Sequence, residues 1–169
     1  MEGLRPVAEF QYADFMSSGY DEITTALARY HYRSGRPGPG GAARTRRAAA
    51  CARRASTRRT PSRGSRTRPG SRSICPAFPS DAKGLLKAAI RDDNPCVFLE
   101  HKWIYRRIKE IVSDDPDYLV PIGKADVKRE GTDVSMIALR RRWCTWRSRP
   151  PRPWRTRASR SRCVDLRTV

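Results

Sequence analysis

The sequence predicts an α/β protein, in which strands alternate with helices that cross over a sheet. Short apolar or alternating runs bounded by turn residues indicate strands, and they lie at residues 7–10, 96–99, 134–139 and 163–169. Between them, apolar residues recur every three or four positions, as on one face of a helix. This alternation favours crossover connections, and 169 residues are enough for one ordinary domain.

The first strand is predicted at residues 7–10, and a helix follows it. Ser17 or Ser18 can cap this helix, because a serine hydroxyl accepts a hydrogen bond from the free amide groups of the first turn. Asp21 and Glu22 lie in that turn, where the helix dipole favours anions. The helix presents one apolar face, which consists of Tyr20, Ile23, Leu27 and Tyr30.

A second helix is predicted after Pro79. Ser80 is a suitable N-cap, and the turn at residues 92–95 ends the helix because Pro95 disfavours helical geometry in the residue before it. The strand at residues 96–99 follows this turn directly. The apolar face of the second helix consists of Ala82, Leu85, Leu86, Ala89 and Ile90.

The positive charge of the chain is concentrated in two stretches. Residues 36–73 contain 12 basic side chains and residues 140–162 contain 10, all of them arginine, and neither stretch contains Lys, Asp or Glu. The remaining residues carry 14 basic and 17 acidic side chains, although the whole chain has a net charge of +19. Residues 36–73 also lack Leu, Ile, Val, Phe and Tyr, so we expect them to be disordered and neither stretch to pack.

Cysteine and hydrophobicity patterns exclude several classes of protein. The five cysteines are odd in number and include no Cys-x-x-Cys pair, so neither a disulfide framework nor a zinc site is indicated. No apolar run approaches the ~20 residues that span a bilayer, and the N-terminus shows no signal-peptide pattern. A cytoplasmic protein without a membrane partner is therefore expected.

Five short motifs occur in succession along the chain, namely EGLRP, YRSG, DAKGLL, KREGTDV and VDLRT. The segments that contain them are residues 1–35, residues 74–106 continuing through 120–139, and residues 164–169. These segments resemble, in the same order, the beta subunit of thiamine-diphosphate-dependent 2-oxo acid dehydrogenases of the pyruvate and 2-oxoisovalerate type. Together they cover well over half of the chain.

The two arginine-rich stretches have roughly the length of the corresponding family intervals but not their residues. This difference suggests out-of-frame translation of GC-rich DNA, which yields Arg, Ala, Pro, Gly and Ser. When the last base of each codon is grouped with the first two of the next, residues 65–73 can give FAHTPGLQV, where the family has FAHTPGLKVV. Residues 141–162 can similarly give an amphipathic helix and a strand. The alternative is a genuine basic, disordered tail and insert.

The resemblance implies a partial pyrimidine-binding domain with a parallel sheet, followed by the start of a transketolase-type C-terminal α/β domain. Residues 1–35 and 74–119 would belong to the first domain, and residues 120–139 and 163–169 to the second. In the intact complex, the implied activity is oxidative decarboxylation of a 2-oxo acid with acyl transfer to lipoyl groups. This chain would be an incomplete piece and inactive alone, because no residue matches the family's activating glutamate or its Tyr-His-Ser segment.

The resemblance also implies a cofactor and partners. Thiamine diphosphate with magnesium would be held mainly by an alpha subunit, which forms a heterotetramer with the beta subunit and serves a lipoyl acyltransferase core. No catalytic residue of the family is matched. By the resemblance, Gln11 and Phe15 fall where the family borders the aminopyrimidine ring. The chemistry agrees with this placement, since an aromatic face can stack on the ring and an amide can form hydrogen bonds with its edge. The alternative is that Phe15 is a core aromatic beside a helix start.

A metal site is implied at the end of the second predicted helix. Ala89, Asp92 and Asn94 match a loop that holds a structural potassium ion in the family. A helix carbonyl together with Asp and Asn oxygens suits such a hard cation. The alternative is a simple helix stop before Pro95.

The alternative function, which belongs to a different class from the dehydrogenase, is non-specific binding of nucleic acid. The arginine-rich stretches, with Trp143, Trp146 and Trp154, could hold RNA or single-stranded DNA through phosphate contacts and base stacking. Nucleic-acid-binding tails usually mix Lys with Arg, whereas these stretches contain no Lys. The sequence therefore favours descent from the dehydrogenase subunit over an evolved nucleic-acid site.

Overall fold

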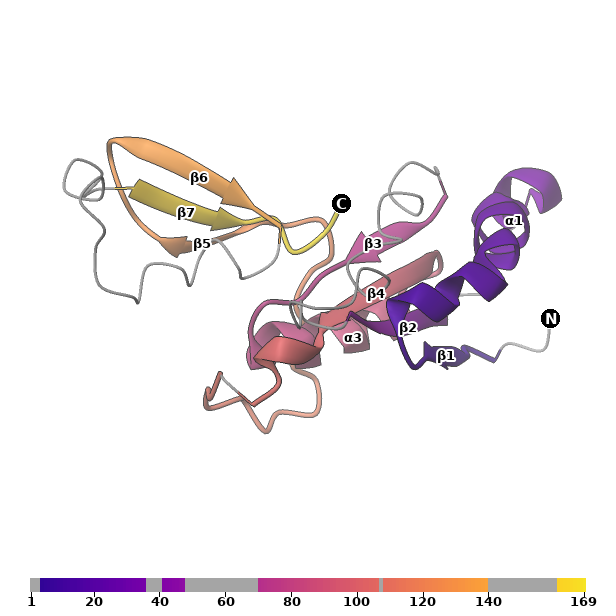
Figure 1. Cartoon of the computed structure of the whole chain (residues 1–169), viewed down its shortest axis with the longest axis horizontal. Coiled ribbons are helices and arrows are strands. Elements are labelled where there is room, and N and C mark those ends of the chain that lie inside the picture. The colour runs from indigo at the N-terminus through magenta and orange to yellow at the C-terminus, as the bar shows by residue number, and fades with distance from the viewer. Residues whose placement is uncertain (1–3, 36–40, 48–69, 107, 140–160) are drawn as a thin grey trace.

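The computed structural model of the chain describes residues 4–35, 41–47, 70–106, 108–139 and 161–169, and it shows two sheets with flanking helices (Figure 1). Sheet A is parallel and has the strand order β1 (Val7–Phe10), β2 (Gly41–Arg47), β4 (Pro95–His101) and β3 (Arg72–Ile74). Sheet B has the order β5 (Asp126–Arg129), β7 (Ser161–Asp165) and β6 (Val134–Ala138). The predicted α/β class is confirmed.

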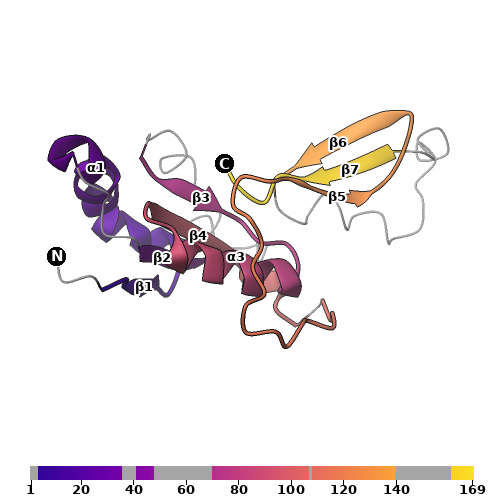
Figure 2. The same cartoon turned by 180° about the vertical axis from the view of Figure 1, so that it is seen from behind.

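Helices cover both faces of sheet A. A helical segment runs through η1 (Ala13–Gly19), η2 (Glu22–Leu27) and α1 (Ala28–Ser34), and α3 (Pro79–Arg91) lies on the opposite face, as the two views show (Figures 1 and 2). Among the helices that the structure describes, none has the length and apolar character needed to cross a bilayer.

Strand β4 contributes to the hydrophobic core on both faces of sheet A, because its side chains alternate between the two helical layers. Cys96 and Phe98 pack on the α3 side, with Leu85 and Val120. Val97 and Leu99 pack on the other face, in a cluster that includes Met16, Ile23 and Cys75. A strand that is buried on both faces is a continuous apolar run, which is why residues 96–99 were predictable as a strand.

The expectation that residues 36–73 do not pack is wrong for part of that range. Gly41–Arg47 forms β2, which pairs in parallel with β1 on one side and β4 on the other. Strand pairing is made by backbone amide and carbonyl groups, so it requires no large apolar side chain. Arg72 and Ser73 likewise belong to β3, and Ser161 and Arg162, from the second arginine-rich stretch, belong to β7. The other residues of both stretches lie outside the described part of the chain.

The predicted serine caps are also wrong. Ser17 and Ser18 lie inside the first helical segment, which begins at Ala13. In α3, Pro79 occupies the first turn, where its fixed φ suits a helix start. The Ser80 amide and hydroxyl donate to the carboxylate of Glu110, at 3.0 and 2.9 Å. A distant carboxylate therefore satisfies the N-terminus of α3 in place of a local cap.

The segment after β4 returns along α3 and is held there by a row of basic side chains. Residues 83, 87 and 91 are four apart, so they share one face of the helix. Gly84 lies beside this row, and a Cβ there would come within 2.5 Å of Val120 Cγ2, so only glycine admits this close approach. The basic contacts are Lys83 to the Ser113 carbonyl, Lys87 to the Pro116 carbonyl at 2.6 Å, and Arg91 to Asp117 at 3.4 Å.

The two sheets are joined through the last residues of the chain. After β7, the backbone of Val169 exchanges two hydrogen bonds of 2.9 Å with Ser73, and the Cys75 amide donates to the Arg167 carbonyl at 2.8 Å. These bonds cover the outer edge of β3 with an extended segment. The predicted strand at residues 163–169 is thus confirmed for β7 and then continues onto sheet A.

A buried ion cluster reinforces this junction. Asp81, on the first turn of α3, is 1% exposed; its two oxygens lie 2.7 Å from Arg167 and 2.9 Å from Lys128. Asp126 completes the cluster, at 2.6 Å from Lys128 and 2.8 Å from Arg167. Lys128 also lies 4.3 Å from the centre of the Phe78 ring. Arg167 adopts a φ of 58°, which costs a residue other than glycine about 1–2 kcal/mol, and its two ion pairs offset that strain.

The cluster favours the charged forms of Asp126 and Lys128. Burial opposes ionisation of Asp126, but the hydrogen bond from Lys128 and the charges of Lys128 and Arg167 lower the pKa of this carboxyl below its ordinary 3.8. Burial likewise opposes the charged form of Lys128, yet bonds to Asp126 and Asp81 raise the pKa of this amine above 10.5. Opposite charges in contact therefore outweigh the cost of partial burial in both cases.

Substitution of Asp81 tests the cluster. Asp81→Ala leaves Lys128 and Arg167 with one carboxylate in place of two, and loss of one member of a buried pair costs about 3 kcal/mol in the free energy of unfolding. The matched control is Asp117→Ala, because Asp117 also contacts an arginine but is 83% exposed and should contribute less than about 1 kcal/mol. Equal effects of the two substitutions in urea denaturation would contradict the proposed role.

The pH dependence of stability gives a second test. Folding lowers the pKa of Asp126, so its contribution is present above pH 3.8 and is lost as the pH falls through the lower folded value. Folding raises the pKa of Lys128, so its contribution is present below pH 10.5 and is lost as the pH rises through the higher folded value. The stability difference between the parent chain and Asp126→Asn should therefore shrink in acid. A difference that does not change with pH would be inconsistent with this account.

Candidate functional site

The carboxyl ends of the four parallel strands meet at one edge of sheet A. Parallel sheets of α/β proteins bind ligands beyond this edge, where the loops that follow the strands come together. Here the edge is formed by the residues that follow β1, β3 and β4, and the described parts of those loops are residues 11–12, 75–78 and 102–106. We therefore place the candidate site at this edge.

The two predicted cofactor residues both lie at this edge. Gln11 follows β1 directly and is exposed, and Phe15 lies in η1 with 55% of its surface accessible. Phe15 is therefore not a core aromatic; the buried position beside it belongs to Met16, which is fully inaccessible. The Phe15 ring meets Tyr12 edge to face, with the centroids 5.9 Å apart and the planes at 78°. This contact leaves much of the Phe15 surface available to a ligand.

Lys102 connects the loop after β1 with the loop after β4. It lies in η4 (Lys102–Ile104), its ammonium donates to the Tyr12 hydroxyl at 3.1 Å, and it lies 5.2 Å from the centre of the Tyr12 ring. The contact orients Tyr12 and, through the ring pair, restricts Phe15. Tyr12 could not be predicted as part of the site, because its role depends on a residue 90 positions away.

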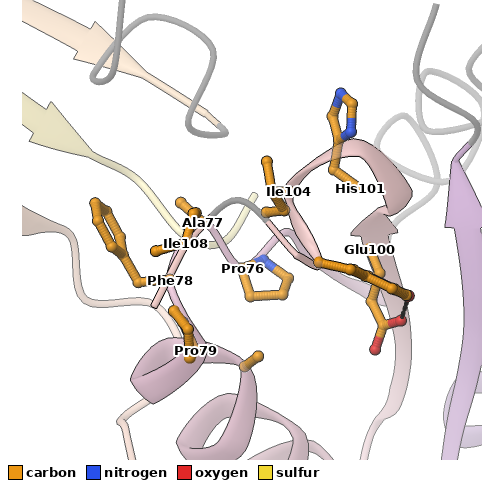
Figure 3. Close-up of a pocket in the computed structure, with 10 residues that line it drawn as sticks. Pro76, Ala77, Phe78, Pro79, Glu100, His101, Ile104 and Ile108 are labelled. Carbon is orange, nitrogen blue, oxygen red and sulfur yellow. Dashed lines mark hydrogen bonds between the residues drawn. The ribbon is translucent and has the colours of Figure 1, made fainter. Parts of the chain in front are cut away.

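A pocket of about 350 Å³ lies at the same edge, beyond β3 and β4 and beside the start of α3 (Figure 3). Glu100 and His101 lie on one side of it and Phe78 on the other. Glu100 is 8% exposed and accepts a hydrogen bond from the Tyr105 hydroxyl. Most of the lining is apolar, and it consists of Pro76, Ala77, Phe78, Pro79, Ala82, Ile104 and Ile108, together with Glu100, His101 and Tyr105.

The predicted potassium ligands lie elsewhere, at the C-terminal end of α3. Ala89 is buried within the helix, Asp92 ends it, and Asn94 is in the turn that precedes β4. The structure thus brings the three residues into one loop.

The thiol of Cys96 lies near this loop. Burial and the charge of Asp92 raise the pKa of the Cys96 thiol to about 12, so this thiol stays protonated. Among the residues that the structure describes, no group of three His, Cys, Asp or Glu side chains could hold a metal ion.

Comparison with known proteins identifies the class to which this fold belongs. The model of the transketolase pyrimidine-binding domain matches residues 1–107, which include all of sheet A. A solved structure described as a split-gene transketolase, an inactive beta4 tetramer, matches 97% of this chain and 49% of its own, with a TM-score of 0.65 and 18% identity. At that identity the match supports the fold alone. The chain belongs to the transketolase pyrimidine-binding domain family.

The relatives within that family are beta subunits of 2-oxo acid dehydrogenases. The 2-oxoisovalerate dehydrogenase subunit beta of Bacillus subtilis is 42% identical, over 81% of this chain and 42% of its own length. The pyruvate dehydrogenase E1 subunit beta of the same organism is 38% identical over the same shares. The mitochondrial counterpart of Caenorhabditis elegans is 40% identical, over 82% of this chain and 40% of its own.

These matches confirm the resemblance predicted from the five motifs. They also show that the chain spans about two fifths of the length of these curated relatives. The nucleic-acid alternative receives no support from them, and Trp143, Trp146 and Trp154 lie outside the described residues.

Proposed function

We propose that this chain is part of the beta subunit of a 2-oxo acid dehydrogenase and supplies the aminopyrimidine side of a thiamine diphosphate site. The observation that carries the proposal is the family match over residues 1–107, the range that contains the whole parallel sheet and its carboxyl edge. Sheet A would be the pyrimidine-binding part, and residues 120–139 and 163–169, which contain sheet B, would begin the C-terminal domain.

The residues at the edge suit an aminopyrimidine ring. Phe15 offers an exposed aromatic face, and Gln11, four positions earlier in the chain and also exposed, offers an amide that can both donate and accept hydrogen bonds. Tyr12, which is fixed by Lys102, limits the positions of the Phe15 ring. When bound, thiamine diphosphate supplies stabilisation of a carbanion through its thiazolium ring, and these side chains would orient the aminopyrimidine ring that is attached to it.

The other half of the site would come from an alpha subunit. Thiamine diphosphate carries a diphosphate that needs magnesium, and the described residues contain no cluster that could hold such an ion. The alpha subunit would therefore hold the diphosphate and magnesium, and the assembly would pass its acyl product to a lipoyl acyltransferase. The substrate would be a 2-oxo acid, because both 2-oxoisovalerate and pyruvate dehydrogenase subunits are relatives.

The first test is activity of the isolated chain. We expect the purified 169-residue chain to release no carbon dioxide from pyruvate or 2-oxoisovalerate, even with thiamine diphosphate and magnesium. The reason is that a site shared between two subunits lacks its diphosphate half in the isolated chain. Release of labelled carbon dioxide is measured against a reaction without protein. Clear turnover by the chain alone would contradict a shared site.

The second test concerns the ring contact. In a mixture of the full chain with the alpha subunit, Phe15→Ala should raise the dissociation constant of thiamine diphosphate about 2–10-fold, because an aromatic contact is worth about 0.5–1.5 kcal/mol. Phe15→Tyr should retain the affinity. Isothermal titration calorimetry with thiamine diphosphate and magnesium gives the constant.

The matched control is Tyr32→Ala, because Tyr32 is 92% exposed on α1 and should not affect binding. Equal affinity of the parent chain and Phe15→Ala would remove Phe15 from the site. Failure of the chain to bind the alpha subunit at all would reject the proposed function itself.

A further inference from the structure

The loop at the end of α3 already contains cations supplied by the chain. The guanidinium of Arg5 donates to the carbonyl of Ile90 at 3.2 Å and to that of Asp92 at 2.6 Å. Its other terminal nitrogen donates to the carboxylate of Asp93. The last carbonyls of a helix lack intrahelical partners and carry a partial negative charge, so they bind cations well. Arg5 satisfies two of these carbonyls and a carboxylate together.

The carboxylate of Asp92 and the carbonyl of Asn94 are engaged as well. Oδ1 of Asp92 accepts from the Asn94 backbone amide and side-chain amide, both at 2.8 Å. Oδ2 of Asp92 lies 3.0 Å from the guanidinium of Arg72. The carbonyl of Asn94 accepts from the thiol of Cys96 at 3.5 Å. The carboxylate and main-chain carbonyl of Asp92, and the carbonyl of Asn94, therefore have partners within the chain.

The local charges balance without an added ion. Arg5 contacts Asp93, and Arg72 contacts Asp92, so two guanidinium groups face two carboxylates. A potassium ion that used the same Asp92 oxygens would lie within a few ångströms of both guanidinium groups. Two like charges at such a separation repel each other even in water, and the repulsion is several times stronger near a protein surface because the effective dielectric constant is lower there.

We propose that Arg5 and Arg72 are the resident cations of this loop and that the chain does not use potassium there. The residues expected to bind the ion, Ala89, Asp92 and Asn94, are brought together. They do not fit the ion because the chain's own donors use both carboxylate oxygens and the carbonyl of Asp92, together with the main-chain carbonyl of Asn94. Arg72 lies in the first arginine-rich stretch, so part of that stretch has acquired a structural contact.

The test compares salts on the full chain. Urea denaturation of the parent chain, followed by circular dichroism, should give the same midpoint in potassium, sodium and choline chloride at equal ionic strength. A midpoint that rises in potassium alone would overturn the proposal. This comparison needs no variant, so it stands even where a substitution prevents folding. Retention of rubidium by the folded chain in equilibrium dialysis is the direct check, and stoichiometric retention would also overturn the proposal.

Substitutions then test the role of the arginines. Arg5→Met should raise the unfolding equilibrium constant roughly tenfold, because it leaves two helix carbonyls and a carboxylate without their donor. The control is Arg91→Met, in which the arginine also contacts an aspartate but is 52% exposed and, in the described contacts, reaches no helix carbonyl. Its effect should be about twofold or less. An Arg5→Met effect no larger than that of Arg91→Met would overturn the assignment.

Discussion

The described structure depends on the contact between Asp81 and the two cations that come from sheet B. Asp81 lies on the first turn of α3, whereas Lys128 is on β5 and Arg167 follows β7. These cations are 47 and 86 positions away along the chain, so one buried carboxylate ties the helix that covers sheet A to both outer parts of the C-terminal segment. The backbone bonds between Val169 and Ser73 join the end of the chain to β3 without any contribution from side chains.

Backbone pairing also explains how a chain with arginine-rich stretches retains a family fold. In β2, each residue from Gly41 to Arg47 has a register partner on β4, and the four residues from Ala42 to Thr45 also have one on β1. The hydrogen bonds of a parallel strand pair are made by backbone amide and carbonyl groups, so almost any sequence that lacks proline can form them. Cores do not have this tolerance, and the two apolar clusters beside β4 use residues from the family-like segments.

Local patterns in the sequence predicted the elements whose burial follows a simple period. The run from Cys96 to Leu99 and the turn before Pro95 gave β4 and the end of α3 at nearly the observed positions. Strand β2 could not be predicted, because its position depends on the free edges of two other strands. The cap of α3 could not be predicted either, since Glu110 reaches Ser80 from 30 positions away.

In the candidate site, too, local motifs predicted some residues, whereas contacts between distant residues could not be predicted. Motif resemblance pointed to Gln11 and Phe15, and the structure places both at the carboxyl edge of the sheet. The contact of Lys102 with Tyr12 joins residues 90 positions apart, so it has no signal in the sequence. For the loop at the end of α3, the motif pointed to residues that lie together in the structure, but it did not reveal their partners, because Arg5 and Arg72 reach the loop from outside the motif.

The position of β2 has a consequence for the time course of folding. In sheet A, β1 pairs only with β2, and β2 joins it to β4, so the N-terminal strand is attached through residues that begin more than thirty positions later. Closing such loops lowers the entropy of the chain before the strand pairing contributes any stability, and sheets of this kind therefore form slowly. During synthesis, sheet A cannot assemble until β4 has left the ribosome. Until then β1 can pair with β2, but the edge of β2 that pairs with β4 stays free, and free strand edges promote aggregation of a nascent chain.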